Sequence, residues 1–161
     1  NAANFKYNPV YGFGKVNADA AVTSAGSYTA GSLGTTKSAD GDSGSINAAI
    51  DSLSVNTYTL SLSKPDDVDG TIEWIRVGLS LNHAIPSSIG ARLQSPSGTV
   101  HNIMFPLTAV STDPSGSTFE LGIAGFYGES VAGTWTLAID EYTDDGTDGV
   151  LLQWDIRAVV R

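Results

Sequence analysis

The chain has 161 residues, a length typical of one domain or of one domain with a tail. Hydrophobic residues make up 41% of the chain and charged residues 16%, so the composition predicts a folded core and excludes the disordered class. Because the net charge is -9, we expect no nucleic-acid partner. The absence of cysteine excludes disulfides and thiol catalysis.

The first 45 residues divide into two parts. Asn17 can serve as the N-cap of a short helix over residues 17–22, with Asp19 near the positive end of the helix dipole. Residues 23–45 are rich in Ser, Thr and Gly with little to bury, which predicts a linker. No apolar run in the chain approaches the ~20 residues that a membrane-spanning helix needs, so we expect no membrane partner.

From residue 46 onward, apolar side chains recur at every second position. This alternation predicts half-buried β-strands over 58–62, 74–83, 89–93, 119–123, 135–139 and 150–160. Turn-forming sequences lie between several of these runs, at 64–70, 95–98, 113–116 and 144–149. Short strands punctuated by turns predict an all-β fold, an antiparallel β-sandwich of jelly-roll type. We expect Trp135 and Trp154 to be anchors of its core.

Three blocks in the strand-rich part carry a family resemblance. They are WIRVGLSLNH at 74–83, ARLQSPSGTVHNI at 91–103 and GFYGESVAGTWTLAIDEYTDDGTDGVLLQWDIRAVV at 125–160. In this order they resemble the P domain, or Homo B domain, of kexin- and furin-like proprotein convertases and of bacterial subtilases. The resemblance implies a galactose-binding-domain-like sandwich. IPSSIG at 85–90 departs from the aspartate-containing segment that is usual in the family.

A second resemblance lies near the start of the chain. NPVYGFGKVNADAAV at 8–22 is similar to the last turn and helix of a subtilisin catalytic domain. The two resemblances imply a catalytic-domain remnant at 1–22, a linker at 23–45 and a P domain at 46–161. They also imply that the chain derives from a larger, secreted subtilisin-like serine endopeptidase, and the absence of cysteine favours a bacterial origin. Its expected partner is its own catalytic domain, and the domain is expected to be a monomer.

Catalysis by the chain itself is not expected. GDSG at 41–44 resembles the nucleophile turn of chymotrypsin-like proteases, for which His83 or His101 would have to act as base. However, the motif lies in the predicted linker, Ser45 stands where that family continues with glycine, and the nucleophile block of subtilisins is absent. We therefore interpret GDSG as a flexible turn and not as a nucleophile turn.

The two histidines have different expected environments. His83 ends an alternating strand, and the resemblance implies a structural role in which it hydrogen-bonds a neighbouring loop. His101 follows the SPSG turn and is expected to be exposed. Neither has a second histidine at the spacing of metal ligands, which argues against a zinc site.

Clustered aspartates are the candidate metal ligands. Their carboxylates would suit Ca²⁺, and the candidates are Asp66, Asp67 and Asp69 in one loop and Asp140, Asp144, Asp145 and Asp148 in or beside another. The alternative is that these residues only start turns and keep the loops soluble. A bound calcium ion would be a structural cofactor that adds stability to the folded state.

Two functions remain open from the sequence. The resemblance implies a non-catalytic domain that supports the folding, stability or regulation of its catalytic domain, with a possible dependence on calcium. The alternative is a substrate-binding module for collagen-like protein or polysaccharide, because jelly rolls are often used for binding. Such a module needs an exposed aromatic patch, for which the candidates are Phe126, Tyr127 and Tyr142.

Overall fold

The computed structural model of the chain describes residues 1–8, 10–32, 34–106, 117–143 and 148–161. It contains one α-helix, one 3-10 turn and nine β-strands in these residues. In chain order they are α1 (Ala18–Ala25), β1 (Lys37–Asp42), β2 (Ala48–Ile50), β3 (Val55–Leu62), β4 (Ile72–Asn82), η1 (Pro86–Ser88), β5 (Ile89–Gln94), β6 (Val100–Met104), β7 (Ser117–Ile123), β8 (Gly133–Glu141) and β9 (Gly149–Val160).

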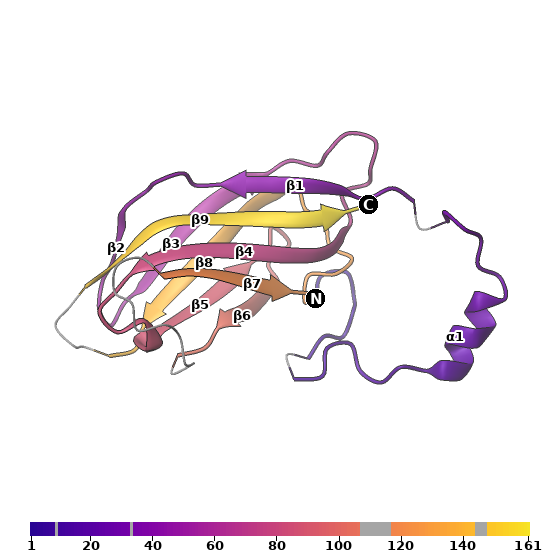
Figure 1. The fold of residues 1–161 in the computed structure, drawn as a ribbon, viewed down its shortest axis with the longest axis horizontal. Coiled ribbons are helices and arrows are strands. Elements are labelled where there is room, and N and C mark those ends of the chain that lie inside the picture. Colours follow the sequence, from indigo (N-terminus) through magenta and orange to yellow (C-terminus); the bar gives the residue numbers. More distant parts are fainter. Residues whose placement is uncertain (9, 33, 107–116, 144–147) are drawn as a thin grey trace.

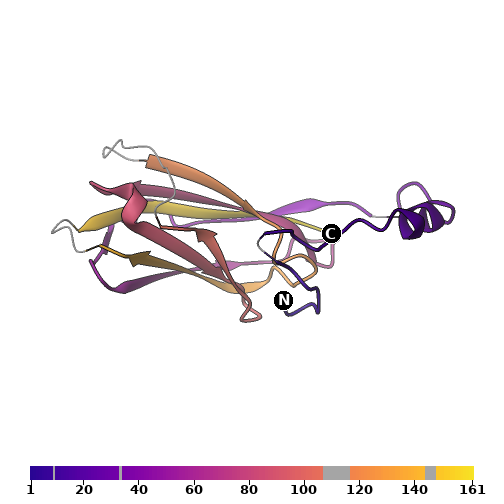
Figure 2. The ribbon, with the colours of Figure 1, turned by 90° about the horizontal axis from the view of Figure 1, so that it is seen from below.

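The strands form two sheets that pack face to face. The β9 sheet has the order β1-β9-β4-β7, with β2 also paired to β9, and the β8 sheet has the order β3-β8-β5-β6. Every pairing between these strands is antiparallel. Figures 1 and 2 show the two layers and the chain ends that lie at one end of them. The predicted antiparallel β-sandwich is therefore confirmed.

The core lies between the two sheets and follows the alternation seen in the sequence. In β4, the side chains of Ile75, Val77, Leu79 and Leu81 are all buried, and the residues between them face outward or are glycine. Trp154 of β9 is 1% exposed and lies in the same core as Trp135 of β8, which is fully buried. Because indoles of this size remove ~150 to 250 Å² each from water, they contribute strongly to folding.

Trp135 is held by a polar contact as well as by packing. Its Nε1 donates a hydrogen bond of 2.9 Å to the carbonyl of Val131. Its ring meets the ring of Phe126 edge to face, with centroids 5.1 Å apart. A buried N–H without a partner would cost free energy, so this bond allows the indole to lie fully inside the core.

The start of the sandwich differs from the prediction. Residues 37–42, expected to be linker, form β1 and pair with Asp155–Val160 of β9. The sandwich therefore begins at Lys37 and not at residue 46. The composition of β1 hid the strand, because it lies at the edge of its sheet and buries only Ala39. The GDSG motif is correspondingly not a linker turn, since its first two residues end β1.

The predicted helix near the N-terminus is confirmed and extends to Ala25. Asn17 is its N-cap, and the Asn17 side chain accepts a hydrogen bond of 3.0 Å from the amide of Ala20. None of its residues is buried, and in Figures 1 and 2 the helix stands apart from both sheets. No helix in the described part of the chain is long and apolar enough to cross a membrane.

Candidate functional site

One end of the sandwich holds the start of the chain, residues 1–8 and 10–13, called here the N-terminal segment. Asn1 is the first anchor, because its side-chain Nδ2 donates to the carbonyls of Gly125 and Tyr127 at 2.9 and 2.8 Å. The amide of Ala2 donates to the carboxylate of Glu129 at 2.8 Å. The segment thus contacts residues more than 120 positions away in the sequence.

Glu129 is the centre of this docking site. Its side chain is nearly fully buried, with 3% of the residue exposed. Besides the Ala2 amide, it accepts hydrogen bonds from Ser95 at 2.7 Å and from Thr99 at 2.6 Å. A buried carboxylate is tolerated only when such donors replace its water. Glu129 therefore joins three parts of the molecule: the turn at 95–99, its own loop and the N-terminal segment.

Gly128 provides the flat surface beside Glu129. Its φ of +82° lies in the left-handed region that favours glycine. A Cβ atom on Gly128 would lie 2.5 Å from Cε2 of Phe5, so the ring of Phe5 occupies the space that a side chain would need. Phe5 also contacts Tyr127 edge to face, at a centroid distance of 5.0 Å. The Gly-Glu pair at 128 and 129 thus binds one aromatic side chain and one backbone amide of the segment.

His101 lies in the aromatic cluster of the same site. Its ring meets Tyr7 of the segment on one side and Phe126 on the other, each at a centroid distance of 5.0 Å. Its Nε2 donates to the carbonyl of Gly125 at 3.2 Å, the same carbonyl that Asn1 contacts. The expectation that His101 is exposed was wrong, because Tyr7 and Phe126 partly cover it.

This environment perturbs the titration of His101. Burial lowers the pKa of His101 from its ordinary value of 6.5, because a charged imidazolium is poorly solvated among aromatic rings. The hydrogen bond to Gly125 and the charge of Glu129 oppose this effect. The neutral ring is therefore the form that fits the docked segment.

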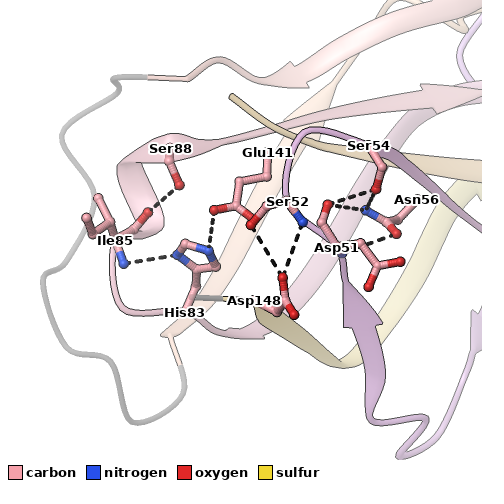
Figure 3. Close-up of polar contacts among 9 residues, drawn as sticks. All are labelled: Asp51, Ser52, Ser54, Asn56, His83, Ile85, Ser88, Glu141 and Asp148. Carbon is pink, nitrogen blue, oxygen red and sulfur yellow. Dashed lines mark hydrogen bonds and ion pairs between the residues drawn. The ribbon is translucent and has the colours of Figure 1, made fainter. Parts of the chain in front are cut away.

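The opposite end of the sandwich has a buried polar pair of its own, shown in Figure 3. His83 and Glu141 are fully buried side chains, with Nε2 and Oε1 2.9 Å apart. The amide of Ile85 donates to Nδ1 of His83 at 3.0 Å. Because Nδ1 accepts this bond, the proton of the neutral ring lies on Nε2 and is donated to Glu141. His83 thereby binds the loop that leads to η1.

A chain of hydrogen bonds continues from Glu141 to the surface (Figure 3). Ser52 donates from its hydroxyl to Oε2 of Glu141 at 3.2 Å, and its amide lies 3.4 Å from Oδ1 of Asp148. This arrangement is not a nucleophilic triad. Ser52 contacts the carboxylate and not the imidazole, and the Ile85 amide occupies the lone pair that a general base would need.

The GDSG serine is also without a base. The hydroxyl of Ser43 accepts a hydrogen bond of 3.0 Å from the amide of Trp154, which ties the end of β1 to β9. The ring nitrogens of His83 and His101 have the partners described above, and Ser43 is not among them. Within the described residues, then, the geometry supports no serine nucleophile.

The candidate calcium ligands are only partly brought together. In the first loop, Asp67 is 3.4 Å from the ammonium of Lys37, which also bonds the carbonyl of Asp66. Asp69 lies in the same loop and lines a shallow cavity together with Asp67 and Arg161. A lysine among the first-loop oxygens competes with a cation for them.

In the second loop, Asp140 pairs with Arg92 at 3.0 Å and Asp148 accepts from Ser52, while Asp144 and Asp145 lie outside the described residues. Among the described residues, no three carboxylate or histidine side chains converge in a way that could hold a metal ion. The described first-loop carboxylates are therefore not gathered around a cation position. Calcium binding at either loop stays a prediction.

The aromatic patch expected for a binding module does not form from the three candidates. Phe126 is fully buried, and Tyr127 packs against Phe5 and Phe13. Only Tyr142 is exposed, at the other end of the sandwich. The sequence reasoning also missed Glu129 and the docking of residues 1–13. The Gly-Glu pair was the available signal, but its contacts are too distant in the sequence for periodicity to reveal them.

The fold is a β-sandwich with two buried carboxylates, Glu129 and Glu141. Their hydrogen bonds hold loops and the N-terminal segment in place. A sequence model of the proprotein convertase P-domain matches residues 72–158, which is more than half of the chain. The chain belongs to this family. The P domain is a non-catalytic accessory domain of subtilisin-like proteases.

Solved structures share the fold. The serine protease of Aeromonas sobria matches 100% of this chain with a TM-score of 0.81 and 21% identity, and the same protease in complex with a chaperone gives 0.84 and 21%. The chain spans about a third of the length of these proteases. A structure of FLHE matches 78% of the chain at a TM-score of 0.55 and 13% identity, and 97% of that protein is covered. No curated protein matches the sequence.

Proposed function

We propose that this chain is the P domain of a secreted subtilisin-like serine endopeptidase, and that it docks on the catalytic domain of the same polypeptide and supports its folding and stability. The observation that carries the proposal is the docking of residues 1–13 on the Glu129 end of the sandwich. Residues 8–22 resemble the end of a subtilisin catalytic domain. In our proposal, a sandwich that binds the chain next to this point lies against that domain.

The contacts favour a rigid connection between the sandwich and the preceding part of the chain over a flexible one. We call the contacts of the N-terminal segment with the sandwich the Glu129 joint. The segment is held by hydrogen bonds from Asn1 and Ala2 and by the ring of Phe5. Helix α1, which follows it, buries none of its residues and exposes Val22. An eight-residue helix with no packing is marginal in water, so α1 needs a covering surface that the sandwich does not provide. In our proposal the catalytic domain is that surface.

The experiment compares variants of the longer protease. We expect Phe5→Ala to lower the yield of mature enzyme and to speed thermal inactivation, because it removes the ring that packs on Gly128 and Tyr127. Tyr142→Ala is the matched control, since it removes a similarly exposed ring at the opposite end. Equal behaviour of the two variants would count against the joint.

Deleting residues 37–161 from the same protease is the stronger test. We expect the shortened enzyme to accumulate poorly, because the N-terminal segment would lose the sandwich on which it docks. A shortened protease with unchanged yield and stability would refute the supporting role. The isolated chain is expected to cleave neither casein nor short peptide substrates.

A further inference from the structure

The outer face of the β9 sheet carries an exposed tryptophan beside a set of planar polar groups. Trp74 pairs with Val159 across β4 and β9, and it is 42% exposed, whereas Trp135 and Trp154 are buried. A bulge between Ile72 and Trp74 shifts the register at this point of β4. Figure 1 shows the four strands of this sheet side by side. An exposed indole on a regular sheet leaves apolar surface in water without benefit to the core.

Charged side chains fill the next two rows of the same face. The register places Asp40, Arg157 and Arg76 in one row, and Asp42, Asp155 and Gly78 in the next. These rows follow that of Trp74 at steps of about 6.6 Å, since two residues of a strand rise by that much. The indole and the polar groups thus form one continuous strip.

The polar groups are held in fixed orientations by one another. Arg76 pairs with both Glu120 and Asp155, and Arg157 Nε lies 3.1 Å from Asp40. Asp155 can reach Arg76 because it lies over Gly78, where a Cβ atom would meet its carboxylate. Such paired, planar groups lose little side-chain freedom when a ligand binds, which reduces the entropic cost of recognition.

Donors and acceptors are left over after these pairings. Among the described residues, Arg157 uses only Nε, so its two terminal nitrogens have no protein partner. The face is also hollowed: a shallow cavity of about 350 Å³ is lined by Asp40, Gly41, Asp42, Arg76, Asp155, Ile156 and Arg157. A few oriented polar groups beside an apolar platform are the composition of a small-ligand subsite.

From this arrangement we infer that the strip binds an uncharged polysaccharide. A sugar ring presents a C–H face that can stack on the indole of Trp74 and hydroxyls that can pair with guanidinium and carboxylate edges. The strip extends over roughly 13 Å from the row of Trp74 to that of Asp155, long enough for more than one sugar ring. This binding would be additional to the docking of the catalytic domain and does not depend on it.

Charge selects among the polymers that could lie on this face. Four carboxylates and two guanidiniums line or border the cavity: Asp40, Asp42, Glu120, Asp155, Arg76 and Arg157. Together with the net charge of -9, this surplus of negative charge disfavours acidic polysaccharides and nucleic acid. The same surplus would attract a basic peptide, but its cations would have to displace the two guanidiniums from the carboxylates that they pair. An uncharged chain meets no charge repulsion and leaves these pairs intact.

Tryptophan fluorescence gives a direct test, because Trp74 is the exposed one of the three indoles. The 161-residue chain is titrated with cellohexaose, N-acetylchitohexaose and xylohexaose, and retention is measured on insoluble cellulose and chitin. We expect a saturable change in emission with at least one oligosaccharide and retention on the matching polymer. Trp74→Ala should weaken binding about tenfold or more, whereas Tyr142→Ala should leave it unchanged.

The outcomes separate the alternatives. Equal melting temperatures of Trp74→Ala and wild type show that any loss of binding is not unfolding. Absence of binding to every glycan, or binding that Trp74→Ala leaves intact, overturns the inference. Retention on polylysine or gelatin, lost in Trp74→Ala but without glycan binding, assigns the face to a polypeptide and overturns it equally. None of these results bears on the Glu129 joint, whose tests use Phe5.

Discussion

Replacement of Gly128 by alanine tests whether the N-terminal segment is bound firmly to the sandwich. A β-carbon at this position would lie 2.5 Å from Cε2 of Phe5 and 3.1 Å from the Cβ of Ala3. Both neighbours belong to the segment, so the segment has to move away. Gly98→Ala is a matched control, because Gly98 also has a left-handed φ, of +87°, but its added Cβ would meet nothing within 4 Å.

The expected magnitudes follow from these two environments. Backbone strain of a non-glycine residue in the left-handed region costs about 1–2 kcal/mol, and both variants should show it. In Gly128→Ala, the partly buried ring of Phe5 also loses its packing, which adds about 1 kcal/mol. If the hydrogen bond from Ala2 to Glu129 breaks as well, the free energy of unfolding falls by a further ~1.5 to 3 kcal/mol. We expect Gly128→Ala to be less stable than Gly98→Ala by about 2 kcal/mol.

Urea denaturation followed by tryptophan fluorescence gives the free energies of unfolding, and amide hydrogen exchange reports on the segment itself. The amide of Ala2 is bonded to Glu129 in the native chain, so its exchange should be slow in wild type and in Gly98→Ala. It should be fast in Gly128→Ala. Equal stabilities of the two variants, together with unchanged exchange at Ala2, would refute the docking as described.

Three further predictions concern the core, the pH dependence and calcium. Trp135→Ala removes a fully buried indole and leaves the Val131 carbonyl unpaired, so we expect a loss of about 3–5 kcal/mol in denaturant titrations; a melting temperature within ~2 °C of wild type would contradict this. Because the pKa of His101 is lowered by burial, its contribution to stability is full above pH 6.5 and is lost as the pH falls through the folded pKa. His101→Gln should flatten the fall in stability between pH 7 and pH 5, and an unchanged slope would show that other groups cause it. Millimolar CaCl₂ should raise the melting temperature over that in EDTA, with superimposed curves ruling out a structural calcium ion at either aspartate loop.

The strands that the sequence predicted are those whose burial alternates. In β4, every second side chain from Ile75 to Leu81 faces the core, and this pattern is visible without a structure. Strand β1 escaped detection, because an edge strand that buries only Ala39 needs no apolar repeat. Strand β2 has three residues, too few for any period to show. Amphipathic strands are thus predictable, while strands defined by pairing alone are not.

The sites were less predictable than the fold, for a related reason. Glu129 and Ala2 are 127 positions apart, and His83 and Glu141 are 58 apart. Such pairs depend on which strand ends the topology brings together, and neither composition nor spacing encodes this. The aspartates of the first loop show the opposite case, in which closeness in sequence does not by itself make a shared site. Asp66, Asp67 and Asp69 are close in sequence, yet Lys37 from another element contacts the carbonyl of Asp66 and the carboxylate of Asp67.

The two ends of the sandwich differ in which residues supply the hydrogen-bond donors to their buried polar groups. At the His83 end, the loop residues Ile85 and Ser52 supply the donors that the buried pair needs, so this end is closed by the sandwich itself. At the Glu129 end, Asn1 and Ala2 supply donors from outside the strands. Without the segment, the Gly125 and Tyr127 carbonyls would lose partners and the Tyr127 ring would lose Phe5.

The N-terminal segment is therefore bound to the sandwich as part of one folded unit, although the resemblance to the end of a catalytic domain begins within it, at residue 8. In the proposed protease, the segment would contribute to both the sandwich and the catalytic domain and would couple their stabilities, because neither could release it without losing contacts of its own. Unfolding of the sandwich would free residues 1–13, and movement of the segment would in turn expose the aromatic cluster around His101. In our proposal, this coupling is the physical route by which the domain supports the protease.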